Sequence, residues 1–138
     1  MSDLKTFCIL LTSFNLLLTS TLQAQSDSQE KRLALVIGNS NYSVGQLDNP
    51  VNDAVLMAKT LDSLHFDVIL DTNLATRRDF IESIKKFGTR VSEYDVAFIY
   101  YAGHGIQLNN ENFMLPTKET FESEFDVEEY GVKVQSIL

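Results

Sequence analysis

The sequence is poor in the residues that most disulfide and metal chemistry requires. Its 138 residues contain one cysteine, Cys8, and two histidines, His65 and His104. Because Cys8 lies in an apolar N-terminal run that we expect to be removed, the exported product would contain no disulfide and no thiolate metal site. Two histidines far apart in the sequence disfavour a zinc site. We therefore expect no metal and no other cofactor.

Basic residues are also scarce. Eleven Lys and Arg stand against 19 Asp and Glu, which gives a formal net charge of -8. A surface of this sign repels a phosphate backbone and an anionic membrane, so we expect no nucleic-acid partner, whereas peptides with basic side chains are compatible. The acidic residues between 119 and 129 lack the alternating ligands and the glycine of a calcium loop, and they are interpreted as a solvated face. They are Glu119, Glu122, Glu124, Asp126, Glu128 and Glu129.

The longest apolar run is confined to residues 7–22 and is interrupted by Thr, Ser and Asn. A membrane-spanning helix needs about 20 consecutive apolar residues, and this run is shorter. It is typical of a signal peptide. We expect a signal peptide over residues 1–24, a short linker over 25–30 and a secreted or periplasmic product with no integral membrane span. An uncleaved N-terminal membrane anchor is the alternative.

From residue 31 onward, short apolar runs alternate with helical periodicity. Strands are predicted over residues 33–37, 68–70 and 96–101. One helix is predicted from Pro50 to about residue 64, and a second opens at Thr76, which has capping-box spacing to Asp79. This order predicts an α/β fold with a mainly parallel sheet. If the first strand lies between the other two, the first and third strands are neighbours about 5 Å apart. Residues 112–115 are a further candidate strand, and residues 132–138 are expected to begin a helix.

Two polar side chains are expected at the same edge of this sheet. The loops that follow the carboxyl ends of parallel strands share one edge, where ligands bind. His104 follows the third strand between Gly103 and Gly105, and Asp53 lies in the first turn of the helix after the first strand. The macrodipole alone would also favour Asp53, and strand-end histidines are often structural. The flanking glycines favour a functional His104, whereas His65 is interpreted as a capping or surface residue.

Five segments resemble the caspase-like cysteine peptidases, the group of caspases, metacaspases and paracaspases. They are LALVIGNSNY (33–42), LDNPVNDA (47–54), LHFDV (64–68), DVAFIYYAGHG (95–105) and NFMLPTK (112–118). The resemblance extends from about residue 31 to the last residue and is closest to paracaspases or bacterial metacaspase-like proteins. It implies the large-subunit catalytic domain over residues 31–138, with a three-layer caspase-like sandwich that is incomplete at its C-terminus.

The resemblance also implies roles for three residues. His104 corresponds to the catalytic histidine, the backbone N–H of Gly105 to part of the oxyanion hole, and Asp53 to the S1-pocket residue that selects Arg or Lys. An imidazole holds a thiol as thiolate and later protonates the leaving amine, and rigid N–H donors stabilise the oxyanion. The implied activity is a cysteine-type endopeptidase that cleaves peptide or protein substrates after basic residues.

The sequence departs from this family in one respect. Caspase-type enzymes place the nucleophilic cysteine roughly 50 residues after the histidine, which corresponds to about position 154. We therefore expect a truncated part of an endopeptidase that is inactive alone. The alternative is an inactive fragment or pseudoenzyme that acts as a binding module through an unpaired sheet edge. A flavodoxin-like ligand-binding domain is disfavoured, because the loop at residues 38–41 lacks phosphate-binding glycine spacing.

Overall fold

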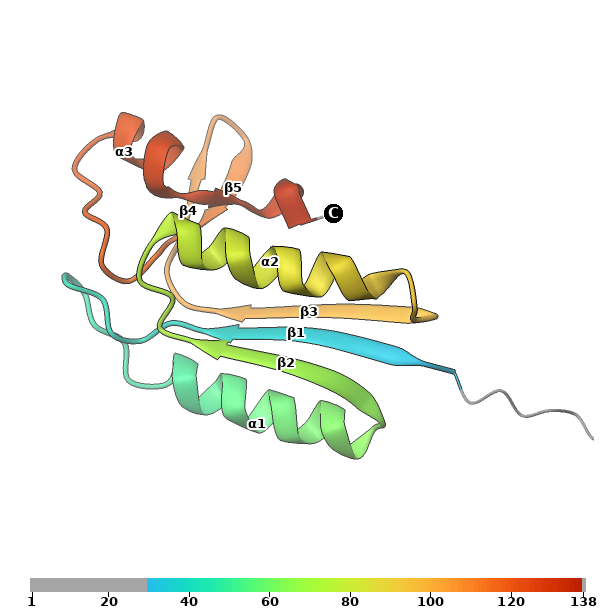
Figure 1. The fold of residues 1–138 in the computed structure, drawn as a ribbon. Helices are drawn as coiled ribbons and strands as arrows, with labels where there is room; N and C mark the ends of the chain where they lie inside the picture. Colours follow the sequence, from blue (N-terminus) through green and yellow to red (C-terminus); the bar gives the residue numbers. More distant parts are fainter. Residues whose placement is uncertain (1–29, 138) are drawn as a thin grey trace, which may run out of the picture.

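The computed structural model describes residues 30–137 (Figure 1). The predicted signal peptide, which contains Cys8, and residues 25–29 of the predicted linker lie outside the described residues. The elements follow in the order β1 (Arg32–Gly38), α1 (Pro50–Ser63), β2 (Phe66–Thr72), α2 (Arg77–Val91), β3 (Val96–Ala102), β4 (Gly105–Leu108), β5 (Glu111–Met114), α3 (Glu124–Tyr130), β6 (Val132–Lys133) and the 3₁₀ helix η1 (Val134–Ile137).

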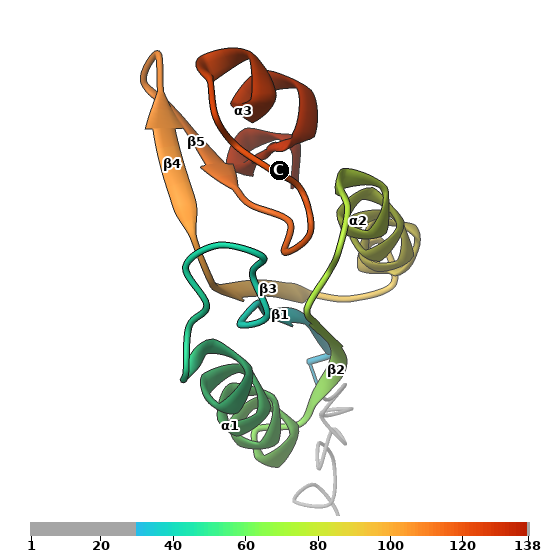
Figure 2. The same cartoon turned by 90° about the vertical axis from the view of Figure 1, so that its left-hand side faces the viewer.

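The central sheet is parallel, as predicted, and its strand order is β2-β1-β3. The helix α1 covers one face of this sheet and α2 covers the other, which gives three layers (Figures 1 and 2). The register aligns Gly38 with Thr72 on one side and with Ala102 on the other. The carboxyl ends of all three strands therefore meet at one edge, and the predicted α/β fold class is confirmed.

The strand β1 is buried on both faces, which explains its unbroken apolar sequence. Residues 33–37 have no exposed surface. Leu33, Leu35 and Ile37 pack in the cluster that includes Phe80 and Phe87 of α2. The alternate residues Ala34 and Val36 pack in the cluster that includes Ala54, Ala58 and Leu61 of α1. This alternation fixes the register of β1, because a slip of one residue would exchange the two packing surfaces.

The strand β3 is as apolar as β1 but is much less covered. Phe98 keeps 37% of its surface exposed, and no residue of β3 is fully buried. The cause is its position, since β3 pairs only with β1 within the described residues and forms an edge of the sheet. The strand β3 therefore has a sequence typical of the interior of a sheet but lies at an edge that is unpaired within the described residues.

The helix α2 begins and packs as its sequence predicts. The Asp79 carboxylate accepts a hydrogen bond from the backbone N–H of Thr76 at 2.8 Å, and the Thr76 hydroxyl accepts one from the Asp79 N–H at 3.3 Å. This reciprocal pair is the predicted capping box. Phe80 and Phe87 are buried, and the other two residues of the predicted apolar face, Ile84 and Val91, pack against the same cluster.

After β3 the chain forms a small antiparallel sheet of order β4-β5-β6. The predicted strand at residues 112–115 is confirmed as β5. The helix expected over residues 132–138 is wrong at its start, because Val132 and Lys133 pair with Met114 and Phe113 instead, and only the short 3₁₀ helix η1 follows. Val132 is 1% exposed in the core cluster, and this burial as a strand outweighs any local tendency to form a helix.

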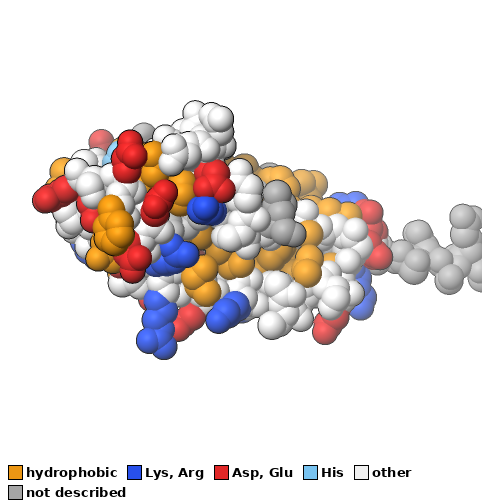
Figure 3. Space-filling model, turned by 90° about the horizontal axis from the view of Figure 1, so that it is seen from above, with side chains coloured by type: hydrophobic (Ala, Val, Ile, Leu, Met, Phe, Trp, Pro, Cys, Tyr) orange, Lys and Arg blue, Asp and Glu red, His pale blue; other side chains and the backbone are white. Residues whose placement is uncertain are grey.

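The acidic segment includes a short helix that was not predicted. α3 begins with a capping box between Ser123 and Asp126, a signal that the sequence SEFD does contain. Acidic side chains gather over α3, at the left of Figure 3. Glu122, Glu124 and the pair at 128–129 are exposed, as expected for a solvated acidic face. Within residues 30–137, no helix combines the length and the apolarity needed to cross a membrane.

Candidate functional site

Two asparagines organise the loops at the carboxyl edge of the sheet. Asn39, which is fully buried, accepts a hydrogen bond from the Leu74 N–H at 2.9 Å and donates one to the Leu115 carbonyl at 3.2 Å. The side-chain oxygen of Asn73 accepts the N–H groups of residues 40 and 41, at 2.9 and 3.0 Å. The loops after β1 and β2 are thus tied to each other and to the segment after β5, which makes this edge a fixed support for functional side chains.

Asp53 lies at this edge because α1 packs closely on the end of β1. A Cβ atom at Gly38 would approach the Ala54 Cβ and the Pro50 carbonyl oxygen to 2.6 Å, so only glycine permits this approach. Asp53 is in the first turn of α1. It is exposed, and its carboxylate has no hydrogen bond or ion pair to another described residue. The structure therefore leaves this charge available to a ligand.

His104 is half-buried and is held by the loop that follows β1. Its ring Nε2 lies 2.6 Å from the Gly45 carbonyl oxygen. Its backbone N–H donates to the Tyr42 hydroxyl at 2.8 Å, and its imidazole lies 4.4 Å from the Tyr42 ring, centroid to centroid. Figure 2 shows this loop, in teal, rising beside the start of β4. The loops after β1 and β3 therefore meet at His104, as the predicted sheet topology requires.

The contact with Gly45 determines the protonation pattern of the neutral imidazole. A carbonyl oxygen can only accept a hydrogen bond, so Nε2 carries the proton. In the neutral ring the lone pair then lies on Nδ1, and this nitrogen has no hydrogen bond to a described residue. The structure therefore presents Nδ1 of His104 as the basic atom.

Gly105 presents its backbone N–H to the outside of the small sheet. The Leu115 N–H donates to the His104 carbonyl at 3.1 Å, and Gly105 stands opposite Met114. In an antiparallel ladder this bond makes Gly105 and Met114 a pair without mutual hydrogen bonds. The Gly105 N–H consequently points away from β5. It is directed to the open side of β4, next to His104, where it can donate to an anionic oxygen.

Two glycines allow this close arrangement. A Cβ atom at Gly103 would lie 2.5 Å from the Tyr42 hydroxyl and 2.6 Å from the Tyr101 hydroxyl. Gly45 has a φ angle of 72°, in the left-handed region, and its Cβ would approach Nε2 of His104 to 3.2 Å. Sequence reasoning singled out Gly103 but missed Gly45 and both tyrosines. Nothing local to Tyr42 or Gly45 indicates a partner about 60 residues away, whereas Tyr101 lies only three residues from His104.

The Tyr101 hydroxyl beside His104 is a neutral hydrogen-bond donor. Burial, together with the hydrogen bond between the Tyr101 and Tyr42 hydroxyls, raises the pKa of Tyr101 well above its ordinary value. Tyr101 donates to the His104 carbonyl at 2.7 Å. This donation therefore persists throughout the physiological pH range.

A hollow of about 410 Å³ lies beside the two glycines that flank His104. Its walls come from Tyr101, from residues of β4 and β5, and from Val134. The lining is mostly apolar, and the hollow is open to solvent. It leaves open space beside Gly105.

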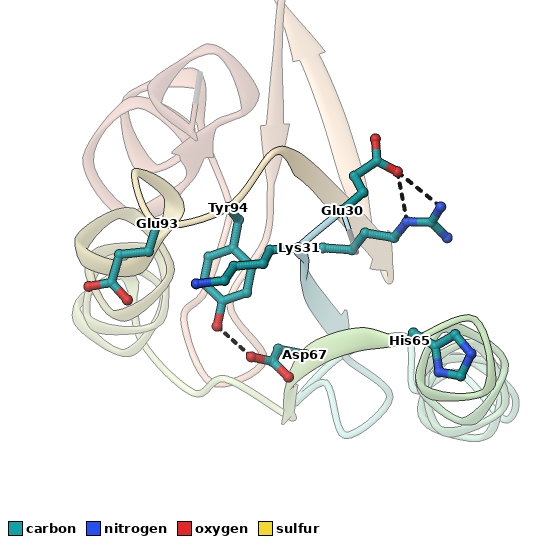
Figure 4. A pocket seen from close by; sticks show the side chains of 7 residues that line it. Glu30, Lys31, His65, Asp67, Glu93 and Tyr94 are labelled. Atoms are coloured by element: carbon teal, nitrogen blue, oxygen red, sulfur yellow. Dashed lines mark hydrogen bonds and ion pairs between the residues drawn. The ribbon is translucent and has the colours of Figure 1, made fainter. Parts of the chain in front are cut away.

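A second hollow, of about 380 Å³, lies at the opposite edge of the central sheet and differs in chemistry (Figure 4). Two of its carboxylates form ion pairs, Glu30 with Arg32 and Asp67 with Arg90. Asp67 accepts hydrogen bonds from Tyr94 and Arg90, and the bond to Asp67 is the main reason that the pKa of Tyr94 is raised. His65, also in its lining, is exposed just after α1, with a φ angle of 64°. The predicted surface role of His65 is confirmed.

The sequence was compared with known proteins. A family model described as the caspase domain matches residues 31–133, which include β1 to β6 and all three candidate site residues. The chain belongs to the caspase-domain family. The comparison with curated proteins found no match.

Membership of the caspase-domain family gives the site a chemical context. It confirms the resemblance at the level of the family, and with it a peptidase-like function toward a protein substrate. In this caspase domain, His104 and Gly105 are adjacent in the chain, and the Gly105 N–H points away from β5. Asp53 lies on the neighbouring loop-and-helix connection at the same edge. Their individual roles remain predictions.

Proposed function

We propose that this caspase domain is the histidine-bearing part of a cysteine-type endopeptidase that cleaves after Arg or Lys, as in metacaspases and paracaspases. The observation that carries the proposal is the imidazole of His104, fixed through Nε2 to the Gly45 carbonyl at 2.6 Å with Nδ1 left open. An open Nδ1 beside an outward N–H is the arrangement that acyl transfer from a peptide requires.

In this mechanism His104 exchanges protons through Nδ1. It takes the proton of the attacking thiol, and it later gives a proton to the amine that leaves as the peptide bond breaks. The backbone N–H of Gly105 donates to the oxyanion of the tetrahedral intermediate. The Gly45 carbonyl keeps the imidazole oriented while its charge changes.

Asp53 would select the side chain on the acyl side of the cleaved bond. A carboxylate with no partner among the described residues binds a guanidinium through two parallel hydrogen bonds, and an ammonium as a point charge. The formal net charge of -8 also favours approach of a basic peptide. Glutamate or aspartate at the same substrate position would be repelled.

The thiol is the part of the mechanism that the described residues do not supply. The 138 residues contain one cysteine, Cys8, which lies outside residues 30–137. The proposal therefore requires a thiol from another polypeptide segment, and we expect the 138-residue chain alone not to cleave peptides. Cleavage of an arginyl reporter by the purified chain, lost in His104→Ala, would refute that expectation.

Substrate binding can be tested without the thiol. We would titrate the isotopically labelled full chain with a short peptide amide ending in arginine and follow backbone amide signals by NMR. The control ligand is the same peptide with citrulline, which keeps the shape of arginine but has no charge. We expect shifts in the first turn of α1 and at residues 103–105, and about tenfold weaker binding of citrulline, since a charge-assisted pair is lost.

Two substitutions that each remove one negative charge make this test specific. Asp53→Asn should remove the preference for arginine over citrulline. Asp62→Asn should keep it, because Asp62 is also an exposed aspartate on α1 but lies in its last turn. Equal effects of both substitutions would mean that the net charge, and not Asp53, attracts the peptide, and would refute the proposed role of Asp53.

A non-catalytic binding module is the second candidate function. It is favoured by β3, which is apolar throughout yet half exposed and pairs on one side only within the described residues. Such an edge can pair with an extended segment of another chain. This function predicts that an extended peptide rich in Val and Ile slows hydrogen exchange at β3 amides, equally in the unsubstituted chain and in His104→Ala.

A further inference from the structure

The Tyr42 hydroxyl occupies a position in the β4-β5 ladder that a direct backbone bond would otherwise fill. The register that places Gly105 opposite Met114 would place His104 opposite Leu115. The Leu115 N–H does donate to the His104 carbonyl, at 3.1 Å. In the other direction, the His104 N–H donates to the Tyr42 hydroxyl at 2.8 Å, and this hydroxyl donates onward to the Leu115 carbonyl at 3.3 Å. A side chain from the loop after β1 is therefore inserted between the two strands.

The same tyrosine also contacts the functional ring. The Tyr42 ring lies 4.4 Å from the imidazole of His104, at an interplanar angle of 54°. Tyr42 is 9% exposed, and its ring packs with Phe113, Leu115 and Val127. A side chain fixed in this way can hold both the backbone and the ring plane of its neighbour.

Tyr101 supports the arrangement without replacing it. Its hydroxyl donates to the His104 carbonyl at 2.7 Å and lies 3.1 Å from the Tyr42 hydroxyl. The His104 carbonyl also receives the Leu115 N–H, so loss of Tyr101 would leave it one donor. The His104 N–H, in contrast, has only the Tyr42 hydroxyl as its acceptor among the described residues.

We propose that Tyr42 is a positioning residue for His104. By separating His104 from the Leu115 carbonyl and packing against its imidazole, Tyr42 keeps Nε2 on the Gly45 carbonyl and leaves Nδ1 without a hydrogen bond to a described residue. Its catalytic meaning rests on the proposed function, but the positioning itself does not. Without the hydroxyl, the His104 N–H can bond directly to the Leu115 carbonyl, which would draw the imidazole away from Gly45.

The test follows the proton on Nε2 of His104 by NMR in the full chain. In the unsubstituted chain we expect this proton to give a resolved signal that exchanges slowly with water. In Tyr42→Phe, which keeps the ring, we expect it to exchange about fivefold faster, the effect of losing one ordinary hydrogen bond. The matched control is Tyr100→Phe, because the Tyr100 hydroxyl has no hydrogen bond to a described residue, and it should leave the rate unchanged.

An exchange rate in Tyr42→Phe equal to that of the unsubstituted chain would overturn the proposal. If Tyr42→Phe does not fold, the unsubstituted chain decides. A slowly exchanging Nε2 proton with strong nuclear Overhauser effects between the Tyr42 and His104 rings supports the proposal, and absence of either signal refutes it.

This readout is independent of substrate. If the expected exchange rates are seen but the chain shows no preference for the arginine peptide, the proposed function is refuted and this inference stands. If the chain prefers the arginine peptide but the exchange rate is unchanged in Tyr42→Phe, only this inference is refuted.

Discussion

Replacing Gly103 with alanine should disrupt the connection between the central sheet and His104. The new Cβ would lie 2.5 Å from the Tyr42 hydroxyl and 2.6 Å from the Tyr101 hydroxyl. An ordinary contact begins at about 3.4 Å, so both hydroxyls would have to move by nearly 1 Å. That movement would break the bonds from the His104 N–H to Tyr42 and from Tyr101 to the His104 carbonyl.

The expected cost follows from these two effects. Two hydrogen bonds contribute about 1 kcal/mol each, and overpacking a fixed site costs about 1–3 kcal/mol. Because movement of the hydroxyls relieves part of the overlap, we expect the free energy of unfolding to fall by about 2–4 kcal/mol. This is a large share of the roughly 5–15 kcal/mol by which a domain is stable.

The assay is urea unfolding of the full chain, followed by circular dichroism, with Gly88→Ala as the control. Gly88 lies within α2, and nothing approaches the position of its Cβ within 4 Å. Alanine at that position should therefore stabilise the helix by about 0.5–1 kcal/mol. A Gly103→Ala variant as stable as the unsubstituted chain would refute the close approach of the two hydroxyls to His104.

Two further predictions concern stability. Asp79→Ala should lower the free energy of unfolding by about 1–2 kcal/mol, because it removes the capping box of α2. The control, Glu82→Ala, breaks only the exposed ion pair with Arg78 and should change the free energy of unfolding by less than about 0.5 kcal/mol. Urea unfolding checks both, and equal effects would contradict the capping role. Burial and Tyr42 raise the pKa of Tyr101, so its stabilising contribution is complete below the ordinary pKa of 10.0 and is lost as the pH rises above it. Phenolate absorbance at pH values near 11 should rise equally in the folded unsubstituted chain and in Tyr101→Phe; a larger rise in the unsubstituted chain would contradict the burial of Tyr101.

The elements that could be predicted are those whose signals are local. The capping box of α2 depends on Thr76 and Asp79 alone, three residues apart. The burial of β1 is evident from five consecutive apolar residues. The strand and helix pattern also indicated a parallel sheet, and the shared edge of parallel strands placed Asp53 and His104 together.

The parts that could not be predicted depend on distant contacts. Tyr42 and Gly45 reach His104 across 62 and 59 positions of sequence. No local pattern distinguishes Gly45 from any other loop glycine. Residues 132–133 are too short a segment to specify a strand by themselves. They form a strand because they pair with β5 and because Val132 packs in the core.

The most direct test of the central claim is to locate a bound arginine peptide relative to His104. We would attach a spin label to the carboxyl side of the arginine and record the broadening of the His104 imidazole signals in the full chain. If arginine bound at Asp53 presents its carbonyl to His104, these signals should broaden strongly, and Asp53→Asn should prevent the broadening. Binding of the labelled peptide with sharp His104 signals, or equal broadening in Asp53→Asn, would contradict the account.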